Sequence, residues 1–374
     1  MTTRSAPLRA VARAALLAAG AVGLSAGAVP PLAAGGEPSP TATPIYEVID
    51  LGALPETNTV IATAVNDAGF VAGYAYMHVA PGHFAELGAR PFLWRNGKMT
   101  ELPAPRGRRG GALAINARGD VGGHAENGKT SLPVIWRHGR GYAVEPLSEL
   151  HGAVTALADD GSAAGDVGER SKYRAFLWAG GQFRILGAPQ DVGSRASDLN
   201  EAGTVVGSYV PAGRLGGGLT PEPEPRAAMW SDGRRIPLLQ LAGEESACLA
   251  INDRGVAVGW YGPWDRRRAC VWEEGKVTAL PGPDDCEIQA RAINRAGVIV
   301  GDVMGPGRRF ASLWRDGELQ DLNDLIPGNS GWLLLAATGI SDSGLIVGYG
   351  SYEKYRTQSL DSSTEAFLLR PRKR

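Results

Sequence analysis

The sequence predicts an all-β protein, a seven-bladed β-propeller of four-stranded antiparallel blades. A ten-residue hairpin pattern, seen as "AVNDAGFVAG", "AINDRGVAVG" and "AINRAGVIVG", recurs along the chain, and a strand ending in Trp follows it. The tryptophans at 94, 136, 178, 230, 272 and 314 are spaced by 42 residues, with one interval of 52. Repeats of about 40–50 residues that carry four strands are typical of propeller blades.

Each repeat contains four expected strands. The first ends at an Asn whose side-chain oxygen can cap the turn, while the Gly three residues later adopts positive φ. The second strand is the "VxG" run and the third ends at the Trp. A two-residue turn such as Asn96-Gly97 then leads into a fourth, alternating strand. The hairpin positions are Asn66, Asn116, Ala158, Asn200, Asn252, Asn294 and Ser341, and the "VxG" runs end at Gly73, Gly123, Gly165, Gly207, Gly259, Gly301 and Gly348.

The two ends of the repeat region predict how the ring closes. The last copy stops after "EAFLLRP", with Leu369 in the Trp place and no fourth strand. "YEVIDLG" at Tyr46–Gly52 resembles a fourth strand without a blade of its own. Pairing the two completes a seventh blade and leaves no open sheet edge. A linear β-solenoid is the alternative, but it has no use for a strand from the other end of the chain.

The repeated motifs resemble the HAF family of extracellular repeats, which is named for a "HAFLW" core. That core reads "RPFLW", "RAFLW" and "EAFLL" here, with Arg90, Arg174 and Glu365 in the place of the family's His. The resemblance covers nearly all of residues 45–371. It implies a secreted, propeller-like protein and no particular reaction, because a scaffold does not fix function.

The N-terminal segment predicts export. Residues 1–34 combine three arginines with a short apolar stretch and small-residue cleavage sites near Ala28 or Ala34, as in a signal peptide, with an uncleaved anchor as the alternative. Residues 35–44 are a flexible linker, 45–371 the propeller and 372–374 a basic tail. We expect a secreted, extracellular monomer with no membrane span in the mature chain. The net charge of −1 argues against nucleic-acid binding, and basic runs such as Arg266–Arg268 are interpreted as solvated loops.

The longer connections predict where a ligand binds. The second-to-third and fourth-to-first connections of every blade lie on one face, and they vary in length, whereas the hairpins on the opposite face are uniform. We refer to the former as the variable face, and binding residues concentrate on such loops. The residue after each "VxG" is polar or aromatic, which predicts a ring around the channel mouth: Tyr74, His124, Asp166, Ser208, Trp260, Asp302 and Tyr349. Strand ends reaching water are the simpler explanation of this pattern.

Trp260, Tyr261 and Trp264 form the densest aromatic group, which predicts either a stacking surface for a sugar or protein or packing between blades. The five histidines have no metal-ligand spacing and no "GxSxG" nucleophile motif occurs, so we expect no metal and no cofactor. Of the three cysteines, Cys248 and Cys286 are expected to form a disulfide, with Cys270 as a small buried residue in the place of Phe92 and Phe176.

These features favour a secreted non-catalytic binding scaffold whose ligand is a glycan, a cell-envelope polymer or a protein. A propeller-type hydrolase or lyase is the alternative. In that case acids such as Asp166 and Asp302, together with His124, would act at the channel mouth.

Overall fold

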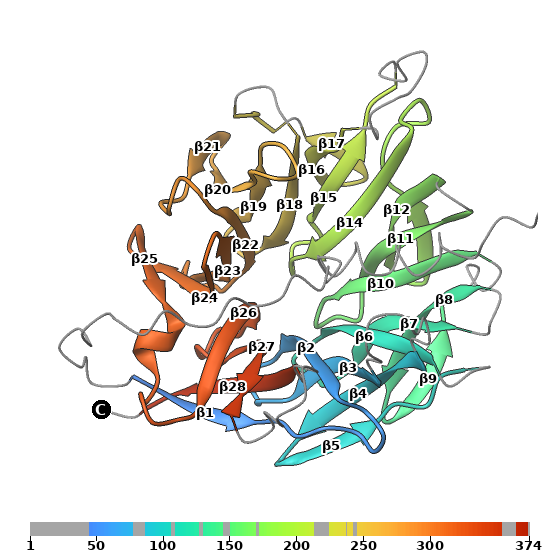
Figure 1. Ribbon diagram of the computed structural model, residues 1–374. Coiled ribbons are helices and arrows are strands. Elements are labelled where there is room, and N and C mark those ends of the chain that lie inside the picture. Colours follow the sequence, from blue (N-terminus) through green and yellow to red (C-terminus); the bar gives the residue numbers. More distant parts are fainter. Residues whose placement is uncertain are drawn as a thin grey trace, which may run out of the picture.

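The computed structural model describes residues 45–77, 87–105, 109–126, 130–144, 150–169, 172–212, 224–236, 238–241, 245–353 and 364–372. It confirms a propeller of seven four-stranded antiparallel sheets. The chain passes from blade to blade around a central axis, and β1 (blue) lies beside β28 (red) where the ring closes (Figure 1). The expected signal peptide, linker and last two tail residues lie outside the described residues.

The first four blades consist of β2 (Thr59–Val65), β3 (Val71–Met77), β4 (Leu87–Arg95) and β5 (Lys98–Glu101); β6 (Arg109–Ile115), β7 (Val121–Glu126), β8 (Ser131–Arg137) and β9 (Arg140–Ala143); β10 (His151–Leu157), β11 (Ala163–Glu169), β12 (Lys172–Ala179) and β13 (Gln182–Ile185); and β14 (Gly193–Leu199), β15 (Val205–Val210), β16 (Arg226–Ser231) and β17 (Arg234–Ile236).

The remaining three blades consist of β18 (Ser246–Ile251), β19 (Ala257–Tyr261), β20 (Arg268–Glu273) and β21 (Lys276–Ala279); β22 (Glu287–Ile293), β23 (Ile299–Gly305), β24 (Arg308–Arg315) and β25 (Glu318–Asp321); and β26 (Trp332–Ile340), β27 (Ile346–Tyr352), β28 (Glu365–Pro371) and β1 (Tyr46–Asp50). A 3-10 turn, η1 (Leu322–Leu325), links the sixth blade to the seventh. Within the described part of the chain, no helix is long and apolar enough to cross a membrane.

The first strand of each blade lies nearest the axis, where it contacts the first strands of both neighbouring blades. The fourth strand is the outermost. The two-residue turns between third and fourth strands have positive φ at both residues, 51° and 80° at Asn96 and Gly97, as the predicted primed turns require. Between neighbouring blades, side chains of the facing sheets form separate apolar clusters.

The "VxG" glycine is fixed by a contact that recurs in every blade. A β-bulge in the first strand shifts its register against the second strand. As a result, a Cβ on any of the seven glycines would lie only 1.9–2.2 Å from a first-strand carbonyl oxygen. In three blades the Phe of the third strand also covers the glycine, with Phe92 over Gly73 as an example. The glycine and the "AFLW" core are therefore two halves of one packing arrangement.

The hairpin asparagines cap their turns as predicted, and they also join neighbouring blades. In each Asn-bearing blade, Oδ1 accepts from the backbone N–H four residues later. Nδ2 donates to the backbone carbonyl of the equivalent residue in the next blade over 2.9–3.2 Å. Ala158 and Ser341 lack this amide, so the third and seventh blades do not make the link.

The predicted closure is confirmed. All five residues of β1 pair with β28, from Tyr46 opposite Pro371 to Asp50 opposite Phe367. Tyr46 is buried in the cluster between the sixth and seventh blades. The seventh blade is also held to the first by Thr338, whose hydroxyl donates to the Ala62 carbonyl over 2.8 Å.

Deleting Tyr46–Gly52 is expected to abolish cooperative unfolding and to cause aggregation, because β28 becomes an open edge and the termini lose their link. Urea denaturation followed by tryptophan fluorescence, together with size-exclusion chromatography, measures both effects. Removal of residues 373–374 is the control and should leave both unchanged. A β1-deleted protein with the parent's midpoint and slope would contradict this account of closure.

Gly301→Ala is expected to lower the free energy of unfolding by about 3 kcal/mol or more, because its Cβ would lie 1.9 Å from the Gln289 carbonyl oxygen in a buried strand. Gly328→Ala is the matched control. No atom lies within 4 Å of the Cβ it would gain, so it should change stability little. Chemical denaturation of the two variants provides the comparison, and similar midpoints would refute the steric explanation.

Candidate functional site

The ring predicted at the channel mouth lies deeper than expected. Each of the seven residues after "VxG" lies within the second strand of its blade. His124, Asp166, Trp260 and Asp302 are buried, and Tyr74, Ser208 and Tyr349 are half-buried. Exposure of strand ends to water therefore does not explain why the residue after "VxG" is polar or aromatic at the buried positions, because those side chains are shielded from solvent.

An aromatic and arginine stack marks the variable face of the fifth blade. The guanidinium of Arg267 lies between two indoles, 4.2 Å from the Trp260 ring centre and 3.9 Å from that of Trp264. Trp260 is 6% exposed, whereas Trp264 is 53% exposed. Of the two alternatives for this aromatic group, packing between blades describes Trp260, and an exposed stacking surface describes Trp264.

Arg267 connects this stack to the sixth blade. Its NH1 lies 3.5 Å from Glu287 Oε1, and both side chains are largely buried. Burial raises the pKa of Glu287, while a hydrogen bond from Gln289 and the charge of Arg267 oppose the rise. The Arg267 Nε is buried and has no hydrogen-bond partner among the described residues. A buried donor without an acceptor is costly, and a ligand oxygen can satisfy it.

A buried ion pair continues the polar region towards the axis. Arg291, the bulge residue of β22, pairs with Asp302 of the same blade, and both side chains are more than nine-tenths buried. Burial lowers the pKa of Arg291, but Asp302, Tyr349 and Glu287 outweigh it and the pKa is raised. Arg291 therefore stays charged, and its pairing compensates part of the desolvation cost.

Two tyrosines complete this sector. Arg309 donates from NH2 to the Tyr349 hydroxyl over 3.1 Å, and its buried Nε has no partner in the described structure. Burial raises the pKa of Tyr74, with Tyr76 and Tyr349 adding to the rise and Arg291 opposing it. We call this group the arginine cluster. It consists of Trp260, Trp264, Arg267, Glu287, Arg291, Asp302, Arg309, Tyr349 and Tyr74.

The remaining predicted residues lie outside the arginine cluster. Asp166 binds Arg195 of the next blade over 2.8 Å, and the Arg195 guanidinium lies over the Tyr173 ring. Burial raises the pKa of Asp166, and Arg195 opposes the rise. Asp166 and Asp302 are therefore each paired with their own arginine rather than with each other. Tyr261 faces the opposite side of β19 from Trp260 and packs between the fourth and fifth blades.

His124 lies in the second blade, close to Tyr74 of the first: a Cβ on Gly111 would lie 2.9 Å from the His124 ring and 3.6 Å from the Tyr74 ring. It is 7% exposed, Gly111 lies against its ring, and its Nδ1 has no partner among the described residues. Burial lowers the pKa of His124 to about 4. The side chain is thus neutral over the physiological pH range.

The expected Cys248–Cys286 disulfide is not present, because all three cysteines are free and buried. Cys248 lies with Cys270 in the cluster between the fourth and fifth blades, whereas Cys286 lies between the fifth and sixth. Cys270 occupies the Phe position, as expected, and faces Gly259 across the strand pair. Among the described residues, no group of three or more potential metal ligands is arranged to hold an ion.

Comparison with known proteins agrees on the fold alone. No family model and no curated protein sequence matches the chain. A streptogramin B lyase structure is 12% identical with a TM-score of 0.51, over 87% of this chain and 98% of that one. The β-propeller domain of the trilobed protease from Pyrococcus furiosus is 9% identical with a TM-score of 0.54, over 84% and 94% of the two chains. The chain thus shares the β-propeller fold with these proteins.

Sequence reasoning missed the arginines that organise the site. The run Arg266–Arg268 was expected to be a solvated loop, which holds for Arg266 but not for Arg267. Arg268 also turns inward and donates to the carbonyls of Gly282 and Pro283. The proximity of "RRR" to Trp260 and Trp264 was the available signal, since guanidinium groups stack on indole rings.

The stability of the fold should fall as the pH drops from 6.5 towards 4, because the unfolded chain takes up a proton at His124 that the folded chain resists down to about pH 4. At pH 5 this amounts to about 2 kcal/mol. Urea denaturation of the parent and His124→Asn at pH 5 and pH 7 measures it, and the variant should show a smaller loss between the two. The exposed His138→Asn is the control. Equal losses in the parent and His124→Asn would contradict the assignment.

Proposed function

We propose that the protein is a secreted, non-catalytic binding scaffold. Its ligand site is the arginine cluster on the variable face, and its ligand is a glycan or cell-envelope polymer, with a protein surface as the alternative. The observation that carries this proposal is the exposed Trp264, stacked on an arginine whose buried Nε still needs an acceptor.

The chemistry of the arginine cluster suits a ligand with both apolar and oxygen-rich surfaces. Trp264 offers an indole that is 53% exposed, and the Arg267 guanidinium lies over one face of its ring. Aromatic faces bind the C–H faces of sugar rings or apolar protein side chains. Arginine donors bind hydroxyl, carboxylate or carbonyl oxygens. Since the Trp260 ring stacks on Arg267 and Glu287 pairs with it, the arginine is already held in place and little ordering is required on binding.

A binding role is better supported than hydrolase or lyase chemistry. Asp166 and Asp302 are each hydrogen-bonded to an arginine of their own rather than to each other, so they do not form the pair of neighbouring carboxylates that such hydrolases use. His124 is buried and its pKa is about 4, well below the pH range in which a general acid or base works best. The likeness to a lyase and a protease propeller is one of fold only, and the same fold serves many functions.

Secretion is part of the proposal and rests on residues 1–34, whose charged start, short apolar stretch and small-residue ends fit a signal peptide. The resemblance to the HAF extracellular repeats points the same way. The free, buried cysteines are compatible with export, since a buried thiol with a raised pKa reacts slowly.

Trp264→Ala is expected to weaken ligand binding by about 1–3 kcal/mol, because a stacking surface is lost. It should change thermal stability little, since the side chain is largely exposed. A glycan array and immobilised peptidoglycan provide the ligands, followed by titration calorimetry. Tyr142→Ala is the matched control, because Tyr142 is also 53% exposed but lies on β9 of the second blade.

Trp260→Ala provides a second comparison. Since this indole is buried, its removal is expected to cost about 3–5 kcal/mol of stability. Ligand binding that survives in Trp264→Ala at the parent's affinity would refute the proposed site, as would binding lost equally in Tyr142→Ala.

A further inference from the structure

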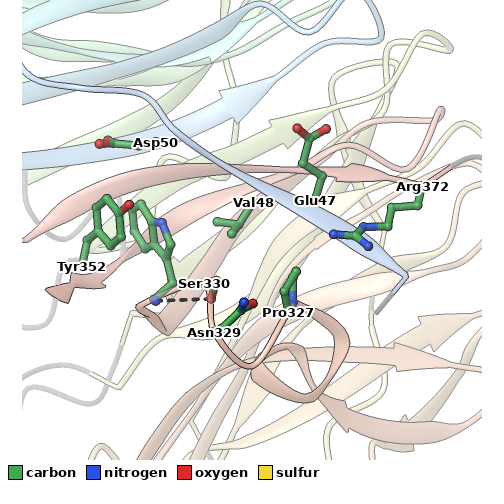
Figure 2. A pocket seen from close by; sticks show the side chains of 9 residues that line it. Glu47, Val48, Asp50, Pro327, Asn329, Ser330, Tyr352 and Arg372 are labelled. Carbon is green, nitrogen blue, oxygen red and sulfur yellow. Dashed lines mark hydrogen bonds between the residues drawn. The ribbon is translucent and has the colours of Figure 1, made fainter. Parts of the chain in front are cut away.

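A groove outside the arginine cluster lies along the flank of the seventh blade. It has a volume of about 270 Å³ and runs between β1 and the segment that connects the sixth blade to β26. Glu47, Val48 and Asp50 of β1 and Pro327, Asn329 and Ser330 of that connection line the groove. In Figure 2 the Val48 side chain points towards the connection, whereas the Glu47 carboxylate points to the other side of β1. None of its lining residues belongs to the arginine cluster.

The aromatic wall of the groove is rigid. Trp332 and Tyr352 are opposite residues of β26 and β27, and their rings stack at 4.9 Å with an angle of 8° between their planes. Phe367 meets the Trp332 ring edge-on at 6.0 Å. The backbone N–H of Trp332 also donates to Ser330 Oγ over 3.3 Å, which ties the connection to the strand. A preformed aromatic surface loses little entropy when a ligand binds.

The polar wall carries donors and acceptors in nearly equal measure. Asp50 supplies carboxylate oxygens and Arg372 supplies guanidinium donors, while the Glu47 carboxylate is paired with Arg370 of β28. The Asn329 amide is both donor and acceptor, and its side chain is exposed at the rim. Asp50 is held in place because its Oδ1 accepts from the Gly52 backbone N–H over 2.9 Å.

This combination selects among ligand classes. An organic cation would be attracted to the Asp50 carboxylate but repelled by the Arg372 guanidinium. An anion would be attracted to Arg372 but repelled by Asp50. A neutral sugar has hydroxyl groups that each donate and accept, and ring C–H faces that pack on aromatic rings. We propose that the groove between β1 and the 326–331 connection binds a short segment of a neutral saccharide.

The test uses the whole protein and three neutral probes, cellohexaose, hexa-N-acetylchitohexaose and maltohexaose, each titrated by calorimetry. At least one is expected to bind. Asn329→Ala should weaken that binding by about two- to tenfold, as expected for one lost hydrogen bond. Trp332→Leu should weaken it more than tenfold. Gln182→Ala, an exposed amide on β13 of the third blade, is the matched control and should have no effect.

Two results would overturn the proposal: no binding of any of the three probes, or binding that Asn329→Ala leaves unchanged. Asn329→Ala decides the outcome if Trp332→Leu fails to fold. Trp264→Ala separates this groove from the arginine cluster. If binding of a hexasaccharide is lost in Trp264→Ala but kept in Asn329→Ala, the hexasaccharide binds at the arginine cluster. That result would support the proposed function and refute the proposed site in the groove.

Discussion

The contact between a second-strand glycine and a first-strand carbonyl oxygen is the constraint on which this propeller depends. The bulge that brings the carbonyl against the glycine recurs in all seven blades, and it leaves no space for a side chain. The same bulge places one extra first-strand residue near the axis, which in the sixth blade is Arg291. A feature that holds the blade together therefore also determines which residues reach the channel.

Much of the fold was predictable because the repeats are local in sequence. Hairpin residues, primed turns and strand alternation act over a few positions, and the Trp period counts the blades. Contacts between blades were less accessible. The Asn66 side chain was expected to cap its own turn, which it does, but its amide also donates to Asn116 in the next blade. A short-range sequence pattern does not predict a hydrogen-bond partner 50 residues away.

The candidate site shows the same distinction between residues that a local motif identifies and contacts between distant segments. Position after "VxG" identified Trp260, Asp302 and Tyr349, because that position recurs in register. It did not identify Arg267 or Arg309, whose long side chains reach these residues from outside the recurring motifs. The motif also grouped His124 and Asp166 with the others, although each lies in its own environment between different blades. Equivalent positions in successive repeats have the same place in the backbone, but their side chains contact different residues.

The pairing of β1 with β28 has a consequence for biosynthesis. The N-terminal segment emerges from the ribosome first, yet Tyr46 of β1 pairs with Pro371, which is synthesised more than 300 residues later. Six blades can form from consecutive segments as they emerge, but the seventh must wait until β28 has been synthesised. During that interval β1 lacks its partner, and an unpaired strand edge is prone to pair elsewhere.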